Sequence, residues 1–325
     1  MTTKGISIII PTWNGKALLQ EFLPSVIESC NNYHAETELI VIDDGSIDGT
    51  SEFLHKEFPF VKLFTLFKNS GYIYASNFGI KQAKHDFVVL LNNDVWMRED
   101  FLTYLPDYFV KTDLFAVRIR VFSYEDKEAI ERGDLDFPAL WIRGVFKYGF
   151  IYTPAEETCL LKDALYKEYA FSVSAGAFAV NKKKWLELGG FDDLYYPFYS
   201  EETDIAYRAL KRGWKIYYEP RSIVYHRGEG FTITKARKSW YINLIGERNR
   251  YFLVWKNIID IGLFSKHILW LPLRLVANIF SARFISFFAF FYALKWVPAI
   301  TKARSKEKRE SRLSDKDIFS FFKLK

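Results

Sequence analysis

The first hundred residues alternate between short apolar runs and segments whose apolar residues recur every three or four positions. Runs such as Ile6–Pro11 and Phe87–Leu91 are typical of strands that are buried on both faces. Leu18–Cys30 and Gly71–Ala83 instead place their apolar residues at helical spacing. Short strands that alternate with helices predict the α/β class, with a Rossmann-like, mostly parallel sheet and helices on both of its faces.

Polar clusters follow three of the predicted strands at the point where each strand ends: Thr12–Asn14, Asp43–Asp44 and Asn92–Asp94. One such cluster decides little, because loops lie in water. The carboxyl ends of parallel strands share one edge of the sheet, however, and ligands bind beyond that edge. Two of the three clusters are acidic, and Asp94 offers the oxygen ligands that suit Mg²⁺ or Mn²⁺. The pattern therefore predicts a ligand site at this edge.

The composition changes after about Trp240, where a long apolar stretch is interrupted by single cations. No charge-free piece approaches the roughly 20 residues that span a bilayer. We therefore expect residues 1–240 to form the α/β domain with the predicted ligand site, 241–301 to form amphipathic helices at a membrane surface, and 302–325 to be a solvated basic tail. The alternative is a helical hairpin packed on the α/β domain or on a second subunit.

The net charge of +6 belongs to the end of the chain. From Asp260 onward there are thirteen Lys or Arg against five Asp or Glu, a surplus of +8, so the preceding part is near −2. A nucleic-acid-binding protein would carry basic residues across its folded face, which argues against that class. Two cysteines without a metal-type spacing, and a start without a secretory signal, favour a cytoplasmic location.

Several motifs, in the same order along the chain, resemble those of family 2 glycosyltransferases, which have the GT-A fold. They include "SIIIPTWNG", "LIVIDDGSIDGT", "KNSGYIYASNFGI", "LLNNDV" and the later block around "YSEETDIAYRALKRGW". The likeness extends from about Ile6 to Gly230. The "LLNNDV" and "EETD" forms resemble rhamnosyltransferase-like members most.

The resemblance implies a site for a nucleoside-diphosphate sugar. In it, Asp43 would accept a hydrogen bond from the ring N–H of the base, with Asp44 beside it. Uracil and thymine present such a donor and cytosine does not, so a UDP- or dTDP-sugar is expected. Gly176 would let the backbone approach the sugar, although it also fits an ordinary turn. The residues implied in this role are Pro11, Thr12, Asn14, Asp43, Asp44, Gly71, Asn77, Asn92, Asn93 and Gly176.

The resemblance also implies a metal site. "LNNDV" is similar to the family's D-x-D motif, but Asn92 replaces the first Asp and leaves Asp94 as the charged ligand for Mg²⁺ or Mn²⁺. His226 matches a histidine that contacts the metal or the diphosphate in relatives. A lone histidine is more often structural, so both roles stay open for it.

"YSEETD" is similar to the motif that carries the family's general base, and Glu202 takes that position. Glu201 and Asp204 remain candidates for the same role. Acids also favour the first turn of a helix for electrostatic reasons alone, which is the competing explanation.

The function implied is transfer of a sugar, with inversion, to a hydroxyl of a glycan or lipid-linked acceptor in polysaccharide assembly. The enzyme would lie at the inner face of a membrane. Two other classes stay open: a nucleotidyltransferase with a similar sheet and metal chemistry, and a catalytically silent binding or scaffold protein. "PTWNGKALL" lacks the glycine-rich basic loop expected of a nucleotidyltransferase.

Overall fold

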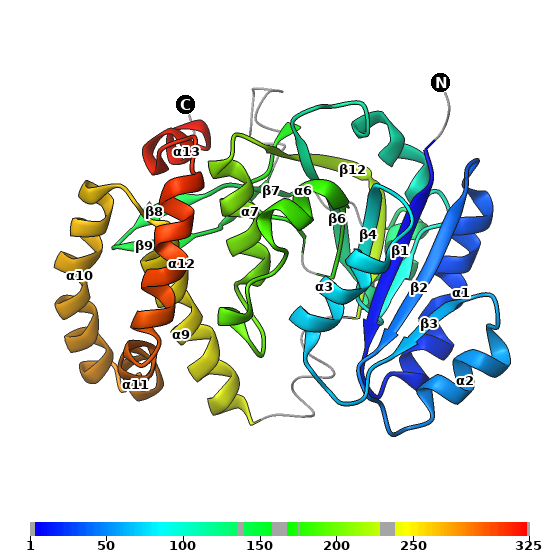
Figure 1. The fold of residues 1–325 in the computed structure, drawn as a ribbon, viewed down its shortest axis with the longest axis horizontal. Coiled ribbons are helices and arrows are strands. Elements are labelled where there is room, and N and C mark those ends of the chain that lie inside the picture. The colour runs from blue at the N-terminus through cyan, green and yellow to red at the C-terminus, as the bar shows by residue number, and fades with distance from the viewer. Residues whose placement is uncertain (1–3, 135–139, 158–167, 175, 228–237, 324–325) are drawn as a thin grey trace.

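The computed structural model describes residues 4–134, 140–157, 168–174, 176–227 and 238–323 (Figure 1). An eight-stranded sheet crosses the molecule in the order β3-β2-β1-β4-β11-β6-β12-β5. β11 is antiparallel to both of its neighbours and β5 is antiparallel to β12, while the other strands share one direction. The strands are β1 (Ile6–Thr12), β2 (Thr37–Asp43), β3 (Lys62–Thr65), β4 (Phe87–Leu91), β5 (Val95–Met97), β6 (Leu114–Ser123), β11 (Ala177–Asn181) and β12 (Lys215–His226).

Helices cover both faces of the sheet, and alternate residues of each strand serve the two faces. In β1, Ile8 and Ile10 pack in one core with Leu23 of α1, whereas Ile9 packs in the other core with Ile73 of α3. The predicted α/β class is confirmed. The helices of this part are α1 (Lys16–Asn32), α2 (Thr50–Glu57), α3 (Tyr72–Gln82), α4 (Lys127–Glu131), α6 (Lys182–Leu188) and α7 (Glu201–Lys211), with 3-10 turns η1 (Phe101–Tyr108), η2 (Tyr124–Asp126) and η4 (Asp193–Tyr195).

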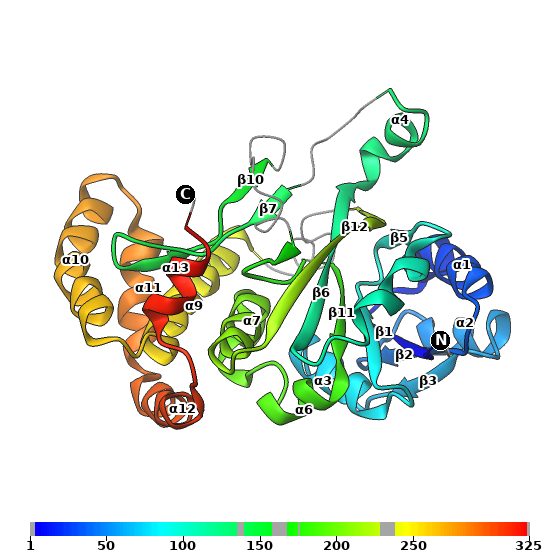
Figure 2. The same cartoon turned by 90° about the horizontal axis from the view of Figure 1, so that it is seen from above.

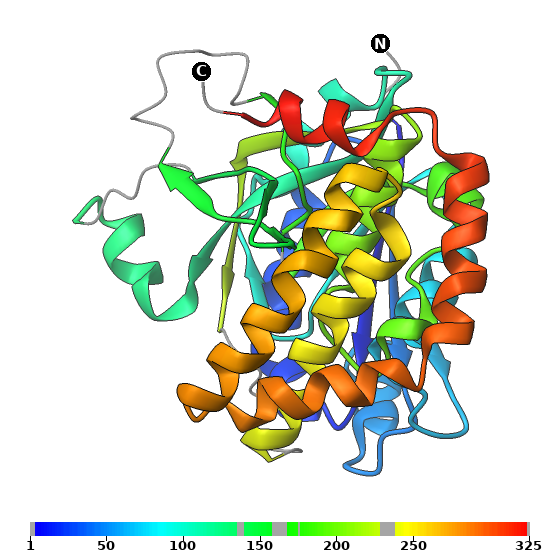
Figure 3. The same ribbon diagram turned by 90° about the vertical axis from the view of Figure 1, so that its left-hand side faces the viewer.

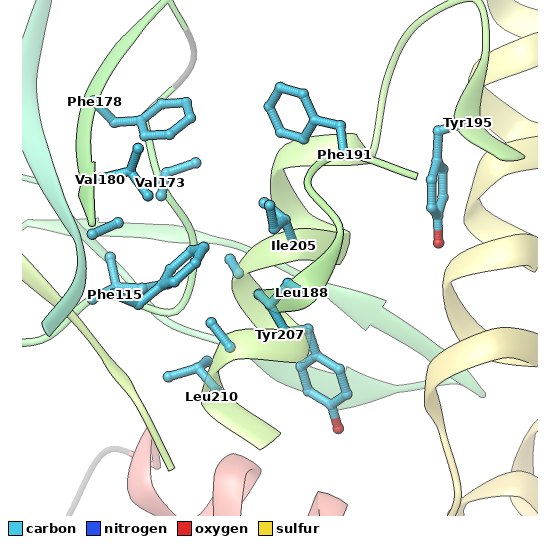
Figure 4. Packing of buried hydrophobic residues seen from close by; sticks show 14 of the residues in the cluster. Phe115, Val173, Phe178, Val180, Leu188, Phe191, Tyr195, Ile205, Tyr207 and Leu210 are labelled. Atoms are coloured by element: carbon cyan, nitrogen blue, oxygen red, sulfur yellow. The ribbon is translucent and has the colours of Figure 1, made fainter. Parts of the chain in front are cut away.

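α7 packs against the core that lies on the same face of the sheet as α3. Phe178 and Val180 of β11 face the apolar side of α7, which presents Ile205 and Leu210 (Figure 4). Phe191, in the turn after α6, is buried and packs in the same cluster. The packing fixes where the first turn of α7 lies, and this turn carries the predicted base.

The middle of the chain, expected to be loops and short helices between Ser123 and Tyr169, also contains two small antiparallel pairs. β7 (Leu140–Ile142) pairs with β10 (Ala155–Glu157), and β8 (Val145–Lys147) pairs with β9 (Phe150–Tyr152). Residues 135–139 and 158–167 of this segment lie outside the described part of the chain.

After the sheet, the described residues form the helices α9 (Ser239–Asn257), α10 (Ile261–Phe280), α11 (Phe284–Leu294), α12 (Val297–Glu310) and α13 (Asp315–Phe321). α9 is part of the main core, because its Tyr251, Phe252 and Val254 are buried in the same cluster as α7. A domain boundary at residue 240 would therefore divide a single core. Figure 2 shows α9 between the α7 side of the sheet and the outer helices.

The segment 302–325 differs from a solvated basic tail, since α12 and α13 return to the catalytic body. Arg212, directly after α7, donates to Glu307 at 2.7 Å, and Lys211 at the end of α7 donates to Asp315 at 2.9 Å. Both of these carboxylates are buried. The two acids could not be recognised as partners of α7 from the local run of charges in which they lie.

α10 and α11 lie on the outside of the molecule, and α10 crosses the front of the view in Figure 3. Among the described residues, no single helix is both long and apolar enough to cross a membrane. α11 and α12 together satisfy the length and composition test, but they are bent by 73° relative to each other.

Candidate active site

The three predicted polar clusters do lie on one edge of the sheet, the lower edge in Figure 1. Thr12 and Asp43 are paired across the parallel strands β1 and β2. Asn93, just beyond β4, donates its side-chain amide to the Thr12 hydroxyl at 2.7 Å. Pro11 precedes Thr12 in β1 and pairs with Ile42. The strand ends thus form one continuous polar surface.

Asp43 and Asn14 together hold the loop that follows β2. Asp43 accepts a hydrogen bond from the Ser46 N–H at 2.9 Å and another from the Ser51 hydroxyl. The Asn14 side chain accepts from the Ile47 N–H at 2.9 Å, and its own N–H donates to Ser46 Oγ at 2.8 Å. Asn14 has a φ of 48°, which asparagine tolerates better than most residues. Each Asp43 oxygen keeps a second acceptor position.

Asp44 holds the loop before α3. One of its oxygens accepts from Ser70 N–H and the other from Gly71 N–H, both at 2.7 Å. Burial raises the pKa of Asp44, and these two hydrogen bonds oppose the rise. Gly71 has a φ of 92°, and a side chain there would lie 2.7 Å from the Tyr196 ring. Asp44 is therefore a positioning residue in this geometry.

Asn77 also links distant segments. Its side chain donates to the Phe191 carbonyl and accepts from the Phe191 N–H, both at 2.9 Å. This pair ties α3 to the turn after α6. Its predicted contact with a nucleotide sugar stays a prediction.

Asp94 and His226 form the candidate metal pair. Asp94 Oδ1 lies 3.1 Å from His226 Nε2, where the start of β5 meets the end of β12. A Cβ on Gly176 would lie 3.1 Å from His226 Nδ1, and the φ of 87° at this position also favours glycine. The Gly176 carbonyl accepts from the Asn92 N–H at 2.7 Å, which draws Asn92 toward the same place.

The donor set fits a divalent cation with incomplete protein coordination. Asp94 offers oxygen and His226 nitrogen, a combination that Mn²⁺ accepts more readily than Mg²⁺ does. The side-chain oxygen of Asn92 is buried and accepts no hydrogen bond from the residues that the structure describes. Within the same residues, no group of three or more His, Cys, Asp or Glu side chains has a metal-binding arrangement.

Glu201 and Glu202 begin α7 after a strained turn. Tyr199 and Ser200 have φ values of 73° and 74°, a left-handed conformation that costs energy in both residues. Asn249 of α9 donates to the carbonyls of Phe198 and Tyr199, both at 2.8 Å. α9 thereby stabilises the turn that aims the two glutamates.

The two glutamates have different electrostatic surroundings. Burial raises the pKa of Glu202 to about 7, against the opposing influence of His226 and Arg118. Burial and the adjacent charge of Glu202 raise the pKa of Glu201 well above its ordinary value. Burial therefore favours the neutral form of Glu201, whereas Glu202 can lose or accept a proton near neutral pH. Only Glu202 thus combines the predicted position with a pKa suited to a base.

Asp204, the third candidate base, is fully buried in an ion network. Its oxygens accept from Arg208 at 2.7 Å, Lys256 at 2.8 Å, Asn257 at 2.8 Å and Tyr195 at 2.9 Å. Burial alone would raise the pKa of Asp204, but Arg208 and Lys256 outweigh it and hold the pKa well below the ordinary value. We assign Asp204 a structural role, since neither its protonation nor its access suits a base.

Sequence reasoning missed three contributors to the site. Arg118 of β6 donates to the Val173 carbonyl at 2.8 Å and acts electrostatically on Glu202; burial lowers the pKa of Arg118 to about 10. Tyr72 of α3 lies within the electrostatic influence of both glutamates and of Asp94. The third is Asn249. For Arg118 a signal existed, because it interrupts the apolar strand "FAVRIRV".

The family model for "Glycosyl transferase family 2" matches residues 7–174. The chain is 26% identical over 225 residues to a poly-beta-1,6-N-acetyl-D-glucosamine synthase of Staphylococcus epidermidis, which covers 68% of this chain and 49% of that protein. It is 24% identical over 296 residues to a chondroitin synthase of Pasteurella multocida, covering 83% of this chain and 29% of that protein. The chain spans about half, or less, of these curated relatives.

Solved structures show the same fold. Residues 1–349 of S. aureus TarS in complex with UDP align with a TM-score of 0.54 at 18% identity, over 94% of this chain and 88% of that one. GalNAc-T7 with UDP, GalNAc and Mn²⁺ aligns with a TM-score of 0.58 at 19% identity, over 80% of this chain and 49% of that one. The fold is the GT-A fold expected from the sequence.

Proposed function

The chain belongs to glycosyl transferase family 2, and we propose that it inverts the anomeric centre of a nucleoside-diphosphate sugar with Glu202 as its general base. The observation that carries this proposal is that Glu202 lies within the electrostatic influence of His226, which in turn lies 3.1 Å from Asp94. A proton acceptor of near-neutral pKa is thereby within electrostatic range of the pair that suits a cation. Family membership favours sugar transfer over the nucleotidyltransferase and scaffold alternatives.

The reaction follows from these positions. Glu202 accepts the proton of the acceptor hydroxyl as its oxygen attacks the anomeric carbon from the face opposite the diphosphate. The bond from that carbon to the diphosphate breaks in the same step, and the nucleoside diphosphate leaves with the electron pair. Arg118 and Glu201, whose pKa is raised by burial, set the electrostatic surroundings of the base.

Asp94 and His226 would hold the divalent cation, which supplies positive charge to the departing diphosphate when bound. GalNAc-T7 was solved with Mn²⁺, as was the Pyrobaculum calidifontis mannosyltransferase PcManGT, which supports a divalent cation as the cofactor here. The choice between Mg²⁺ and Mn²⁺ belongs to the proposal, and the imidazole of His226 favours Mn²⁺.

For the donor we propose a UDP- or dTDP-sugar, on the argument that Asp43 accepts from the N3–H of a uracil or thymine base. The hydrogen bonds from Ser46 and Ser51 would keep the carboxylate oriented for this contact. Pro11, Thr12 and Asn93, which line the same edge, would complete the donor site.

The acceptor, we propose, is a glycan or lipid-linked hydroxyl used in polysaccharide assembly at the inner face of a membrane. The similar proteins of Staphylococcus epidermidis and Pasteurella multocida are a poly-beta-1,6-N-acetyl-D-glucosamine synthase and a chondroitin synthase, which supports this class. The closer rhamnosyltransferase-like assignment rests on the "LLNNDV" and "EETD" forms alone.

Nucleoside diphosphate release tests the proposal. The protein is incubated with UDP-, dTDP- and GDP-sugars, with Mn²⁺ or with a chelator, and the freed diphosphate is measured. We expect metal-dependent release from a uridine or thymidine donor. Release from GDP-sugars alone would contradict the role of Asp43, and release that survives the chelator would contradict the metal site.

A further inference from the structure

The outer helices α10 and α11 contact each other, and both expose large apolar side chains. We call these side chains the α10–α11 face and define it by Ile261, Leu269, Leu273 and Phe280 of α10 with Phe288 and Phe291 of α11. These side chains are between 48% and 87% exposed. Isolated apolar residues on a surface need no explanation, but this many on two adjacent helices indicate an interaction site.

The pattern along each helix makes the face one-sided. In α10, the exposed residues recur at helical spacing, while His267 and Asn278 on the opposite side are buried. In α11, Phe284, Phe288 and Phe291 follow the same rule, and Ala289 and Ala293 are buried against the body. The small alanines let α11 lie close to α9, which leaves the phenylalanines pointing outward.

The charge around the face has a single sign. Between Asp260 and Glu307 the chain contains seven Lys or Arg and no Asp or Glu. Lys266, Arg283 and Lys295 are exposed, and none of them forms an ion pair with any residue that the structure describes. A second copy docked on the same face would bring these like charges together, since a two-fold interface pairs a surface with itself. Anionic headgroups would instead attract them.

Aromatic side chains mark one margin of the face. Trp270 of α10 and Tyr148 in the turn between β8 and β9 are both exposed, and their rings lie 5.1 Å apart in an edge-to-face contact. Trp and Tyr are enriched at the boundary between apolar lipid and water. Neither helix alone is both long and apolar enough to cross a bilayer, and the one-sided exposure of each suits a helix that lies in the plane of the bilayer surface.

We propose that the α10–α11 face docks on an anionic lipid bilayer. This docking rests on the proposed function in one respect: it would bring the enzyme to a lipid-linked acceptor. α9 connects the two places: it contacts α11 along its length, and its Arg248 and Asn249 hold the turn before Glu201. Docking thus acts on the same element that positions the base.

Truncation is a poor test of this face, because residues beyond it supply Glu307 and Asp315 to the catalytic body. The variant of choice replaces Leu269, Leu273, Phe280 and Phe288 with Ser in the full chain. All four side chains are more than half exposed, so the fold should be retained. The matched control, Phe60→Ser with Val110→Ser, removes two equally exposed apolar residues elsewhere.

The measurement is flotation with vesicles of phosphatidylcholine, alone or mixed with phosphatidylglycerol, without any donor sugar. We expect the full chain and the control to bind the anionic vesicles, less so in salt, and the four-Ser variant to lose about tenfold or more of its partitioning. Lys266→Glu with Lys295→Glu should weaken binding to anionic vesicles but not to neutral ones.

Equal flotation of the four-Ser variant and the full chain would overturn the proposal, as would failure of the full chain to bind anionic vesicles at low salt. Light scattering tests the alternative occupant, which is a second copy of the chain. If the full chain is a dimer, the four-Ser variant is not, and the full chain does not bind vesicles, the face belongs to a second copy. Diphosphate release in solution is followed separately. If flotation is lost while diphosphate release is retained, only the docking proposal fails. If release is lost while flotation is retained, only the proposed function fails.

Discussion

At the scale of single residues, Glu202 carries the chemistry. Glu202→Gln keeps the shape of the side chain but removes the proton acceptor, so turnover should fall by about 10²–10⁴-fold while donor affinity is unchanged. Glu201→Gln should cost only a few-fold, because burial raises the pKa of Glu201 well above its ordinary value and so disfavours its charged form. Initial rates at saturating donor test both variants, with the exposed Glu187→Gln as control. A larger loss for Glu201→Gln would move the base by one residue.

The raised pKa of Glu202 also predicts a conflict between stability and activity. A carboxyl with a folded pKa of about 7 and an ordinary value of 4.5 binds its proton more tightly in the folded state. Folding stability therefore falls as the pH rises from about 4.5 to 7, by roughly 3 kcal/mol from this group, whereas activity rises through pH 7. Glu202→Gln should raise the unfolding free energy at pH 8 and leave it nearly unchanged at pH 4.5. Urea titrations at the two pH values measure this free energy of unfolding. An equal effect of the mutation at both pH values would refute the prediction.

At the scale of elements, α9 is the support of the active-site turn. Asn249→Ala removes the donor of three hydrogen bonds to the carbonyls of Tyr195, Phe198 and Tyr199. Buried carbonyls left without partners cost about 1–3 kcal/mol, and the left-handed turn should relax. We expect a lower free energy of unfolding. We also expect a lower turnover in the protein that remains folded, since Glu202 is then misdirected. The exposed Asn243→Ala on the same helix is the control, and unchanged turnover in Asn249→Ala would show that the turn needs no such support.

The strands β1 and β4 could be read from the sequence because their signals are local. The apolar runs of β1 and β4, and the polar residues at their ends, lie within a few positions of one another. Asn249 and Arg118 could not be assigned in this way, because their partners lie 50 and 55 residues away along the chain. For the same reason, the packing of α12 could not be predicted. The run "KARSKEKRESR" is basic locally, yet its Glu307 accepts a hydrogen bond from Arg212, 95 residues earlier.

At the scale of the whole molecule, the C-terminal helices close the catalytic body. Asp315 accepts from Lys211 at 2.9 Å and Tyr207 at 2.7 Å, and its other oxygen accepts two backbone N–H groups at 2.6 Å. Asp315→Ala leaves the buried cation of Lys211 without its partner, which should cost about 3–5 kcal/mol. Asp317→Ala, on the same helix but exposed, removes only a helix cap and should cost about 1 kcal/mol. Equal urea midpoints for the two variants would contradict the closing role of α13.

The docking of α12 and α13 has a consequence for biosynthesis. Lys211 and Arg212 stand at the end of the helix that begins with Glu201, and their counter-charges arrive 104 and 95 residues later. At ribosomal rates of about 5–20 residues per second, α7 waits several seconds with two cations that have no buried partner. We therefore expect the C-terminal end of α7 to reach its full stability only once α12 and α13 have left the exit tunnel.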